Sequence, residues 1–297
     1  MNTTPTSAPG ASTGTAAGLP DAVRLLLMER ISQNKLELPV LPDVASKVVN
    51  MCNDPNADSR ALAQLVQRDA AMAGHLMRLA NSVLYAPAVP LVSLDQVVSR
   101  MGMKKVREIA LVISCQSKVF AVPGHEDLVK ALFRHSLAAG AFAQEIARSR
   151  RWNVEEAFLC GLLHDVGRPV LLQELVDLHK KANCPFNLSA TTSVITALHT
   201  RIGSALVNGW SLPARLGETI LHHHSPAASK TAAQTAMMTN LADDMAHMLM
   251  PVPGERVPTA DQIREHPMLE SLNLYPDEMD ALLGQCDKVK VMVNAVG

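Results

Sequence analysis

The amino-acid sequence predicts an all-α protein in two parts, an N-terminal helical subdomain packed against a helical bundle. Of the 297 residues, 48% are hydrophobic but only 3% are aromatic, so the apolar content favours helices over strands. Apolar side chains recur at helical spacing in successive segments, and Pro, Gly or Asn residues separate several of these segments. The chain is long enough to enclose a sizeable core.

The charge balance and the cysteines exclude several functional classes. Basic and acidic residues nearly cancel, 27 against 28, so we expect no nucleic-acid partner and no polybasic membrane anchor. The five cysteines are scattered and never in CxxC spacing, which is typical of reduced thiols in the cytosol. Neither a signal peptide nor an apolar run of about 18 residues is present. We therefore expect a soluble, cytoplasmic protein without a membrane partner.

The N-terminal part of the chain begins with a segment of low complexity and continues with short helical patterns. Residues 1–19 are mostly Thr, Ser, Pro, Gly and Ala, which predicts a disordered tail. Residues 20–126 form the predicted N-terminal subdomain, which lacks any concentration of acid–base groups and is typical of a packing or interaction module. Its expected helices are Asp21–Ser32, Asp43–Cys52, one starting near Ser59, Ala70–Ser82, Ser93–Met101 and Lys104–Phe120.

Histidines are concentrated in the second predicted part, residues 127–250, which holds eight of the eleven. We expect this part to be the helical bundle. Its expected helices are Leu128–Ser149, Val154–Leu175, Ser189–Asn208, Pro213–His222 and Ala232–Leu249. Residues 251–297 are predicted to form a C-terminal helical extension, with helices at Ala260–Glu265 and Pro276–Val293.

The adjacent pair His164–Asp165 is the most informative feature of the bundle sequence. Metal-activated hydrolysis requires imidazoles and carboxylates that converge on one cation. Adjacent side chains on a helix project about 100° apart, so this pair reaches one metal only on a distorted or shared helix face. Gly161 and Gly167 flank the pair and would let neighbouring helices approach closely.

Further metal ligands would come from other helices of the bundle. His135 shares a face with apolar residues and should point inward, and His199 precedes a glycine by one helical turn. The triplet 222–224 consists of three histidines at a predicted helix end, and a carboxylate would come from Asp243 or Asp244. Each histidine alone is also compatible with a hydrogen-bonded core residue or a solvated helix terminus. It is their ordered combination that indicates a metal site.

At these residues the chain resembles the HD superfamily of metal-dependent phosphohydrolases, and more closely its HDOD branch, the HD-related output domain. The resemblance covers about residues 30–250. In the first half it rests on Leu38-Pro-Val-Leu-Pro42, Asn53-Asp-Pro55, Arg68-Asp69, Leu79-Ala-Asn-Ser82 with Tyr85, and Met101-Gly102. In the second half it rests on Arg134-His-Ser136, Gly161-Leu-Leu-His-Asp-Val-Gly167, His199 with Gly203, Trp210-Ser-Leu-Pro213 and His223-His-Ser-Pro226.

The resemblance implies roles for individual residues and a two-part HD-type fold. It implies that four residues are metal ligands, namely His135, His164, Asp165 and Asp243. It also matches His199 and His223 to the extra histidines of HD-GYP phosphodiesterases, which hold a second metal. The implied cofactor is a divalent or di-metal centre of Fe, Mn, Mg or Zn. For the last carboxylate, the family pattern favours Asp243, whereas helical periodicity favours Asp244.

Two departures from HD-GYP enzymes affect the expected function. Arg168 stands where those enzymes have a lysine, and it becomes the candidate for holding a phosphate. After His224 the chain continues Ser-Pro-Ala-Ala-Ser229 without a Gly-Tyr-Pro signature, which argues against a phosphodiesterase of that type. HDOD proteins resemble regulatory output modules more than enzymes.

We therefore expect a signal-transduction output protein of bacterial type that binds a signalling protein partner and holds metal at the HD site, with no residue assigned to catalysis. The alternative is a metal-dependent phosphohydrolase acting on a nucleotide or cyclic nucleotide, in which a small nucleotide would be the ligand. A third reading is a scaffold whose buried histidines are hydrogen-bonded without metal.

Overall fold

Helices form the described fold, which confirms the all-α prediction. No strand occurs among the residues that this computed structural model describes. The predicted disordered tail, residues 1–19, lies outside the described residues except for Leu19, whose side chain is buried in the larger of two hydrophobic cores. The described residues are 19–33, 35–36, 38–54, 56–82, 87–210 and 212–296.

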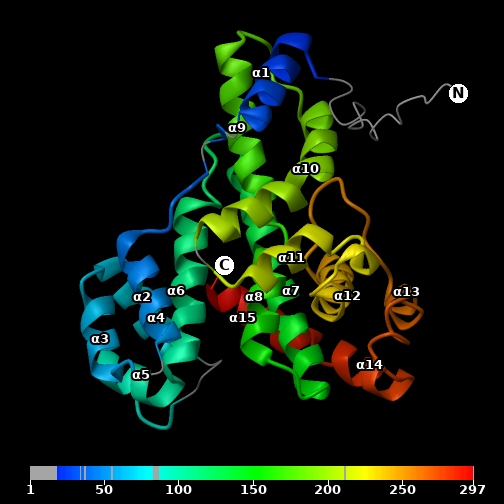
Figure 1. Cartoon of the computed structure of the whole chain (residues 1–297). Helices are drawn as coiled ribbons and strands as arrows, with labels where there is room; N and C mark the ends of the chain where they lie inside the picture. The colour runs from blue at the N-terminus through cyan, green and yellow to red at the C-terminus, as the bar shows by residue number, and fades with distance from the viewer. Residues whose placement is uncertain are drawn as a thin grey trace, which may run out of the picture.

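A small helical block, which we call the N-terminal block, begins at Asp43 and encloses its own core. It lies at the lower left in Figure 1. Asp58 and Asp69 each precede one of its helices and accept a hydrogen bond from a backbone N–H of the first turn. Aliphatic side chains such as Val48, Leu62 and Leu76 fill this core. The helices are α2 (Asp43–Asn53), α3 (Ser59–Gln67), α4 (Ala70–Ala80), α5 (Leu94–Met101) and the first half of α6 (Met103–Lys118).

The first and last helices of the predicted N-terminal subdomain both reach the bundle. Helix α1 (Asp21–Ser32) packs against α9 (Gly167–Lys181), and Leu27 lies in the larger core. The first helix of the predicted N-terminal subdomain therefore lies on the bundle. Helix α6 reaches both cores, since Val106 is buried in the small one and Leu111 in the large one.

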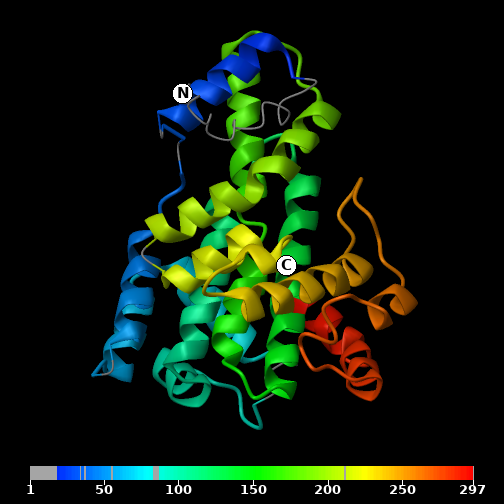
Figure 2. The ribbon, with the colours of Figure 1, turned by 45° about the vertical axis from the view of Figure 1, so that its right-hand side comes forward.

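The bundle surrounds the larger core and is organised around α7 (Glu126–Ser149). Phe133, Phe142 and Ile146 of α7 are almost fully buried in it. Helices α8 and α12 pack along α7, whereas α10 packs against α9 and α11 (Figure 2). Besides α7 and α9, the bundle contains α8 (Val154–Leu163), α10 (Leu188–Gly209), α11 (Ala214–His222), the 3-10 turn η2 (Pro226–Ala228) and α12 (Ala233–Leu249).

The helix predicted at Val154–Leu175 is wrong in one respect, because the structure breaks it at the HD pair. Helix α8 ends at Leu163, residues 164–166 form a turn, and α9 begins at Gly167. In this turn the backbone N–H of residue 168 donates to the carbonyl of Asp165 at 2.9 Å. The break removes the 100° restriction of a regular helix, so both side chains of the pair can face one point.

The C-terminal extension packs on the bundle through three helices. Helix α15 lies against α7, and α13 contacts α12. The single helix predicted at Pro276–Val293 is two helices, because the chain turns at Gly284 and Gln285. Its elements are α13 (Ala260–Arg264), α14 (Pro276–Leu283) and α15 (Cys286–Val296).

All five cysteines are free, in keeping with the scattered pattern in the sequence. Among the described residues, no helix combines the length and the apolar character needed to cross a bilayer.

Candidate metal centre

Three side chains from different parts of the bundle converge on one buried point. His135 comes from α7, His164 from the turn after α8, and Asp243 from α12. His135 Nε2 lies 3.0 Å from Asp243 Oδ1, and His164 Nε2 lies 3.3 Å from the same oxygen. The two imidazole nitrogens are 3.3 Å apart. None of the three residues is more than 5% exposed.

Asp165 links this group to a second set of histidines. Its Oδ2 lies 3.5 Å from His164 Nε2, and its Oδ1 lies 3.2 Å from His199 Nε2 and 4.0 Å from His223 Nε2. His224 Nε2 lies 3.2 Å from His199 Nε2, and the His224 residue reaches solvent. A carboxylate placed between two groups of imidazoles is suited to bridging two cations.

The structure thus brings together all six residues that the sequence marked as metal ligands. It also separates the two candidate carboxylates of α12. Asp244 turns away from the group, with its Oδ2 3.4 Å from His266 Nε2, so the geometry favours Asp243. We call the assembled set the histidine–aspartate centre. Its members are His135, His164, Asp165, His199, His223, His224, Asp243 and His247.

Two glycines allow the helices around the centre to approach closely. A Cβ atom at Gly161 would lie 2.4 Å from the carbonyl oxygen of Ala139 on α7. A Cβ atom at Gly167 would lie 2.1 Å from the carbonyl oxygen of His199 on α10. Both distances are shorter than any real contact, and both partners are backbone atoms. Glycine is therefore required at both positions for the ligands to meet.

Backbone carbonyls orient three of the imidazoles. The Nδ1 atoms of His164, His199 and His223 lie within hydrogen-bond distance of carbonyl oxygens in their own helical turns, at 2.6, 2.9 and 2.8 Å. An Nδ1–H that donates to a carbonyl leaves Nε2 as the lone-pair atom, and Nε2 is the atom that faces the centre in each case. Histidines that bind metal in proteins are oriented in this way.

Several buried polar atoms of the centre have no hydrogen-bond partner. These include the Oδ1 of Asp165 and the Nε2 of His223, and the Oδ2 of Asp165 has an ion pair with Arg168 but no hydrogen bond. Among the described residues, overlapping groups of three place one donor atom each within 4.8 Å of the others, for example His164, His223 and Asp243. Neutral imidazoles and carboxylates in such proximity fit a divalent transition metal, because a cation satisfies lone pairs that otherwise repel one another.

The charges of the centre raise the pKa of His164 and lower the pKa of the two aspartates beside it. Burial alone would lower the pKa of His164, but the carboxylates of Asp165 and Asp243 outweigh it and raise this pKa to about 9. Burial would raise the pKa of both aspartates, yet nearby cationic groups, Arg168 beside Asp165 and His164 beside Asp243, hold both values well below the usual range. Without metal, a proton on His164 provides positive charge between two carboxylates.

Three other histidines of the centre, His199, His223 and His247, have a pKa below the ordinary value, which favours the neutral imidazole. Burial lowers the pKa of His199 to about 4, and burial with the nearby His135 does the same for His247. Burial also lowers the pKa of His223 well below its usual value. Neutral imidazole is the form that coordinates metal, so these side chains need not lose a proton to bind one.

Arg168, the candidate for holding a phosphate, lies between two carboxylates. Its Nε is 2.6 Å from Asp165 Oδ2, and its Nη1 forms an ion pair with Glu255 Oε1. The residue is 6% exposed. Both ends of the guanidinium are therefore occupied by groups of the chain itself.

Three residues near the centre were not assigned by sequence reasoning. His247 follows Asp243 by four residues, so helical spacing alone would have put the two on one face. His224 belongs to the histidine triplet, but the resemblance matches only His223 to a metal ligand. Glu255 follows the Pro-Gly turn after α12 and has no periodic signal, so its place could not be read from the sequence.

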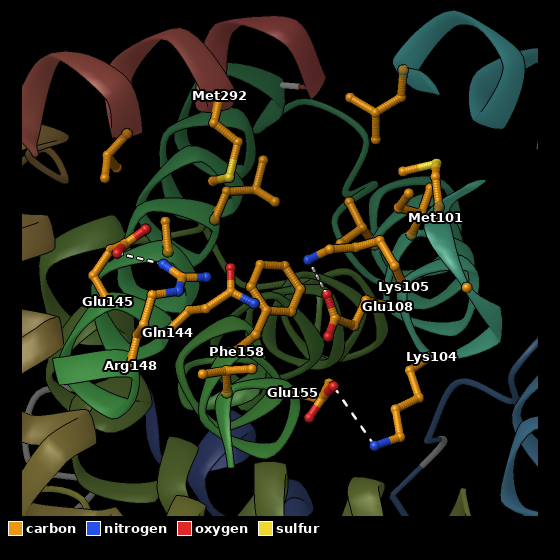
Figure 3. A pocket seen from close by; sticks show the side chains of 18 of the residues that line it. Met101, Lys104, Lys105, Glu108, Gln144, Glu145, Arg148, Glu155, Phe158 and Met292 are labelled. Atoms are coloured by element: carbon orange, nitrogen blue, oxygen red, sulfur yellow. Dashed lines mark hydrogen bonds and ion pairs between the residues drawn. The ribbon is translucent and has the colours of Figure 1, made fainter. Parts of the chain in front are cut away.

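A second feature, which we call the junction pocket, is separate from the centre; Figure 3 shows the side chains that line it. It is a cavity of about 570 Å³ between α6, α7, α8 and α15, and no member of the histidine–aspartate centre lines it. Phe158 and Met292 face its interior, and ion pairs such as Glu145–Arg148 and Lys104–Glu155 border it. The junction pocket therefore lies where the N-terminal block, the bundle and the C-terminal extension meet.

Comparison with known proteins gives one family match. The HDOD domain model matches residues 38–226 of this chain. An uncharacterised protein from Treponema pallidum (strain Nichols) is 22% identical over 218 residues, which cover 69% of this chain. The alignment covers 42% of that relative, so this chain spans less than half the length of the curated protein it matches.

Several solved structures share the fold. One is a Shewanella amazonensis SB2B protein whose name proposes a metal-dependent phosphohydrolase, with 18% identity, TM-score 0.71, and coverage of 94% of this chain and 100% of that one. Another is an HDOD domain protein of unknown function from Geobacter sulfurreducens, with 24% identity, TM-score 0.68, and coverage of 93% and 97%. A third, from Marinobacter aquaeolei VT8, has a name that proposes signal transduction, with 22% identity, TM-score 0.64, and coverage of 96% and 68%. At these identities the likeness shows the fold alone.

Proposed function

Because this chain belongs to the HDOD domain family, we propose that it is a cytoplasmic signal-transduction output protein that holds divalent metal in its histidine–aspartate centre. In this proposal it acts through contacts with a signalling protein partner. Metal at the centre would fix the segments that carry its ligands, so that α7, α10, α12 and the turn between α8 and α9 would move as one body. No residue is assigned to catalysis.

The orientation of the imidazoles is the observation that carries metal binding. His164, His199 and His223 each bond a backbone carbonyl through Nδ1 and present Nε2 to the centre. His199 and His223 are held by their own backbone with their lone-pair atoms directed at the buried carboxylate of Asp165, an arrangement that is costly to maintain for packing alone. In a purely structural cluster, each neutral imidazole should donate from one ring nitrogen and accept a hydrogen bond at the other.

The ion pairs of Arg168 favour a regulatory function over hydrolysis. A substrate phosphate would need this guanidinium, yet Asp165 and Glu255 already engage it in a buried position. Exchanging two carboxylates for one phosphate would require the Glu255 segment to withdraw first. Regulation through protein contacts has no such requirement.

One observation favours a metal-dependent phosphohydrolase as the second candidate. His224 is exposed and lies 3.2 Å from the fully buried His199, Nε2 to Nε2, so this side of the centre borders solvent at His224. A divalent metal supplies Lewis-acid activation of a phosphoester when bound. In that case His199 and His223 would hold the metal, and a nucleotide or cyclic nucleotide would approach past His224.

The metal content of protein purified without chelators tests the proposal. We expect bound transition metal in the wild type and none in a His164→Ala/Asp165→Ala double variant. Absence of metal from the wild type would contradict both candidates.

A screen of the metal-loaded protein against nucleotide phosphoesters then separates the two candidates. The regulatory proposal expects no turnover that depends on the centre. Hydrolysis that disappears in the double variant would replace it with the phosphohydrolase.

A further inference from the structure

His247 of α12 lies beside two carboxylates at once. Its Nε2 is 3.3 Å from Asp243 Oδ1, one helical turn earlier, and 3.2 Å from Glu255 Oε2. Its ring also lies against that of His135, with the centroids 4.2 Å apart. The donor atoms of His135, Asp243 and His247 are all within 4.8 Å of one another. This group forms the edge of the centre nearest the C-terminal extension.

One proton cannot satisfy both contacts of the His247 ring. A neutral imidazole carries a single N–H, on Nδ1 or on Nε2. If Nε2 holds it, only one carboxylate receives a hydrogen bond; if Nδ1 holds it, the Nε2 lone pair faces two carboxylate oxygens. The buried Nδ1 atom has no hydrogen-bond partner in the described structure. A cation bound to Nε2 and Asp243, with Glu255 drawn in by a shift of its side chain, would remove the conflict.

The local chain geometry aims Glu255 at this point. The preceding Gly254 has φ 83°, a left-handed conformation that favours glycine, and the backbone N–H of Glu255 donates to the carbonyl of Val252 at 3.1 Å. Val252 is 3% exposed and belongs to the larger core. The tight turn is thus anchored in the core, and it places a carboxylate from outside the bundle beside Arg168 and His247.

We propose that His247 and Glu255 are metal ligands, which join His135 and Asp243 in completing the coordination of one cation at this edge of the centre. The inference rests on the proposed metal binding and adds two ligands that the HD pattern does not supply. Histidine nitrogen with aspartate and glutamate oxygen is a donor set suited to Zn, Mn or Fe.

This ligand set divides the centre into two unlike halves. Structural metal sites have all positions filled by protein, whereas catalytic sites keep one position open. With His135, Asp243, His247 and Glu255 the first half would have four ligands from the chain, whereas the second half includes the exposed His224. The first half would fasten the C-terminal extension to α7 and α12 through the metal.

Titration of chelator-treated, full-length protein with Co²⁺ tests this inference. The visible absorption of Co²⁺ depends on the number and kind of its ligands, and competition with a chelator gives the dissociation constant. We expect Glu255→Gln and His247→Gln each to raise the dissociation constant of one Co²⁺ by at least about tenfold. This is the lower end of the loss of affinity seen when a group that supports a metal ligand is changed. Each should also change the Co²⁺ spectrum.

Matched controls come from the same parts of the chain. Glu265→Gln changes an exposed carboxylate of the same extension, and Asp244→Asn changes the outward carboxylate of α12; both should keep the wild-type spectrum. Arg168→Gln removes the other partner of Glu255. Circular dichroism in the presence of chelator confirms that each variant folds. If His247→Gln does not fold, Glu255→Gln decides alone, because Glu255 lies outside the bundle.

The outcomes separate this inference from the proposed function. If the wild type binds no Co²⁺, the proposed metal binding fails and this inference fails with it. If the wild type binds Co²⁺ but Glu255→Gln keeps the wild-type affinity and spectrum, only this inference is overturned. If Glu255→Gln and Arg168→Gln both weaken binding but leave the Co²⁺ spectrum unchanged, then Glu255 acts from outside the coordination shell together with Arg168, and its role as a ligand is rejected.

Discussion

The histidine–aspartate centre and the junction pocket place polar and apolar groups in opposite ways. In the centre, every member except His224 is buried, and the buried groups are imidazoles and carboxylates. In the junction pocket, the interior is lined by apolar side chains such as Phe158 and Met292, and most charged residues lie at its border in ion pairs (Figure 3). Polar groups are costly to bury without partners, whereas an apolar cavity is suited to a ligand or a partner side chain.

This difference suggests that the two regions have separate roles, metal binding in the centre and ligand or partner binding in the junction pocket. The centre would fix the bundle through metal, and the junction pocket lies where the N-terminal block and the C-terminal extension meet the bundle. If the two regions are independent, a change in one should leave the other unaffected.

Gly167→Ala should have the largest effect, because it disturbs the fold and the centre together. The new Cβ would meet backbone atoms of α10 at 2.1 and 2.7 Å, and backbone cannot move aside as a side chain can. We expect a loss of at least about 3 kcal/mol in the free energy of unfolding, the upper end for overpacking, and loss of bound metal. Urea unfolding and metal analysis measure both.

Gly209→Ala is the matched control for this substitution. Gly209 ends α10, and a Cβ there meets nothing within 4 Å. Alanine should be neutral or slightly stabilising at this position. A Gly167→Ala variant with wild-type stability would show that α9 and α10 are less closely apposed than the structure indicates.

Asp243→Asn should abolish metal binding while the adjacent Asp244→Asn should not. Asp243 Oδ1 contacts the Nε2 atoms of His135, His164 and His247, whereas Asp244 contacts His266. We expect the first change to weaken metal binding by more than about 100-fold, beyond the range for groups that only support a ligand. Isothermal titration with Mn²⁺ compares the two variants. Equal effects would mean that the assignment of the carboxylate is wrong.

The sequence and the structure agree on the centre for a physical reason. Motif residues such as His164 and Asp165 are recognisable because their chemistry requires particular side chains in a particular order. The turn that breaks the helix between Leu163 and Gly167 could not be predicted, because local periodicity continues through it and tertiary contact with α10 ends it. Glu255 was missed for a similar reason, since its position depends on how a non-helical turn packs against the core.

The pH dependence of stability should differ between the metal-free and the metal-bound protein. The pKa of His164 is raised to about 9 by Asp165 and Asp243 despite burial, against 6.5 for the ordinary side chain. Its charged form therefore adds stability that is complete below about pH 6.5 and is lost as the pH rises through about 9. With EDTA, the melting temperature should fall over this range.

Metal should reverse this trend, because coordination requires His164 to be unprotonated. With saturating Mn²⁺, the melting temperature should hold steady or rise between pH 6.5 and 9. In EDTA, Asp243→Asn should flatten the profile, since it removes one of the two carboxylates that raise the pKa of His164. Identical profiles with EDTA and with Mn²⁺ would contradict the assignment of His164 as a ligand.

Glu108→Gln in the junction pocket should have the smallest effect and leave the metal centre unchanged. Glu108 is 1% exposed and forms an ion pair with Lys105, and burial raises the pKa of its carboxyl above the ordinary value despite that partner. A raised pKa in the folded state means that its contribution to stability is complete below about pH 4.5 and is lost as the pH rises through the folded-state value. Glutamine does not ionise, so the variant avoids that loss. Its free energy of unfolding in urea, relative to that of the wild type, should rise between pH 5 and pH 7.5, and the two values should differ by no more than about 1 kcal/mol at neutral pH. Its Mn²⁺ affinity should equal that of the wild type, and a weakened affinity would show that the pocket and the centre are coupled through α7 and α8.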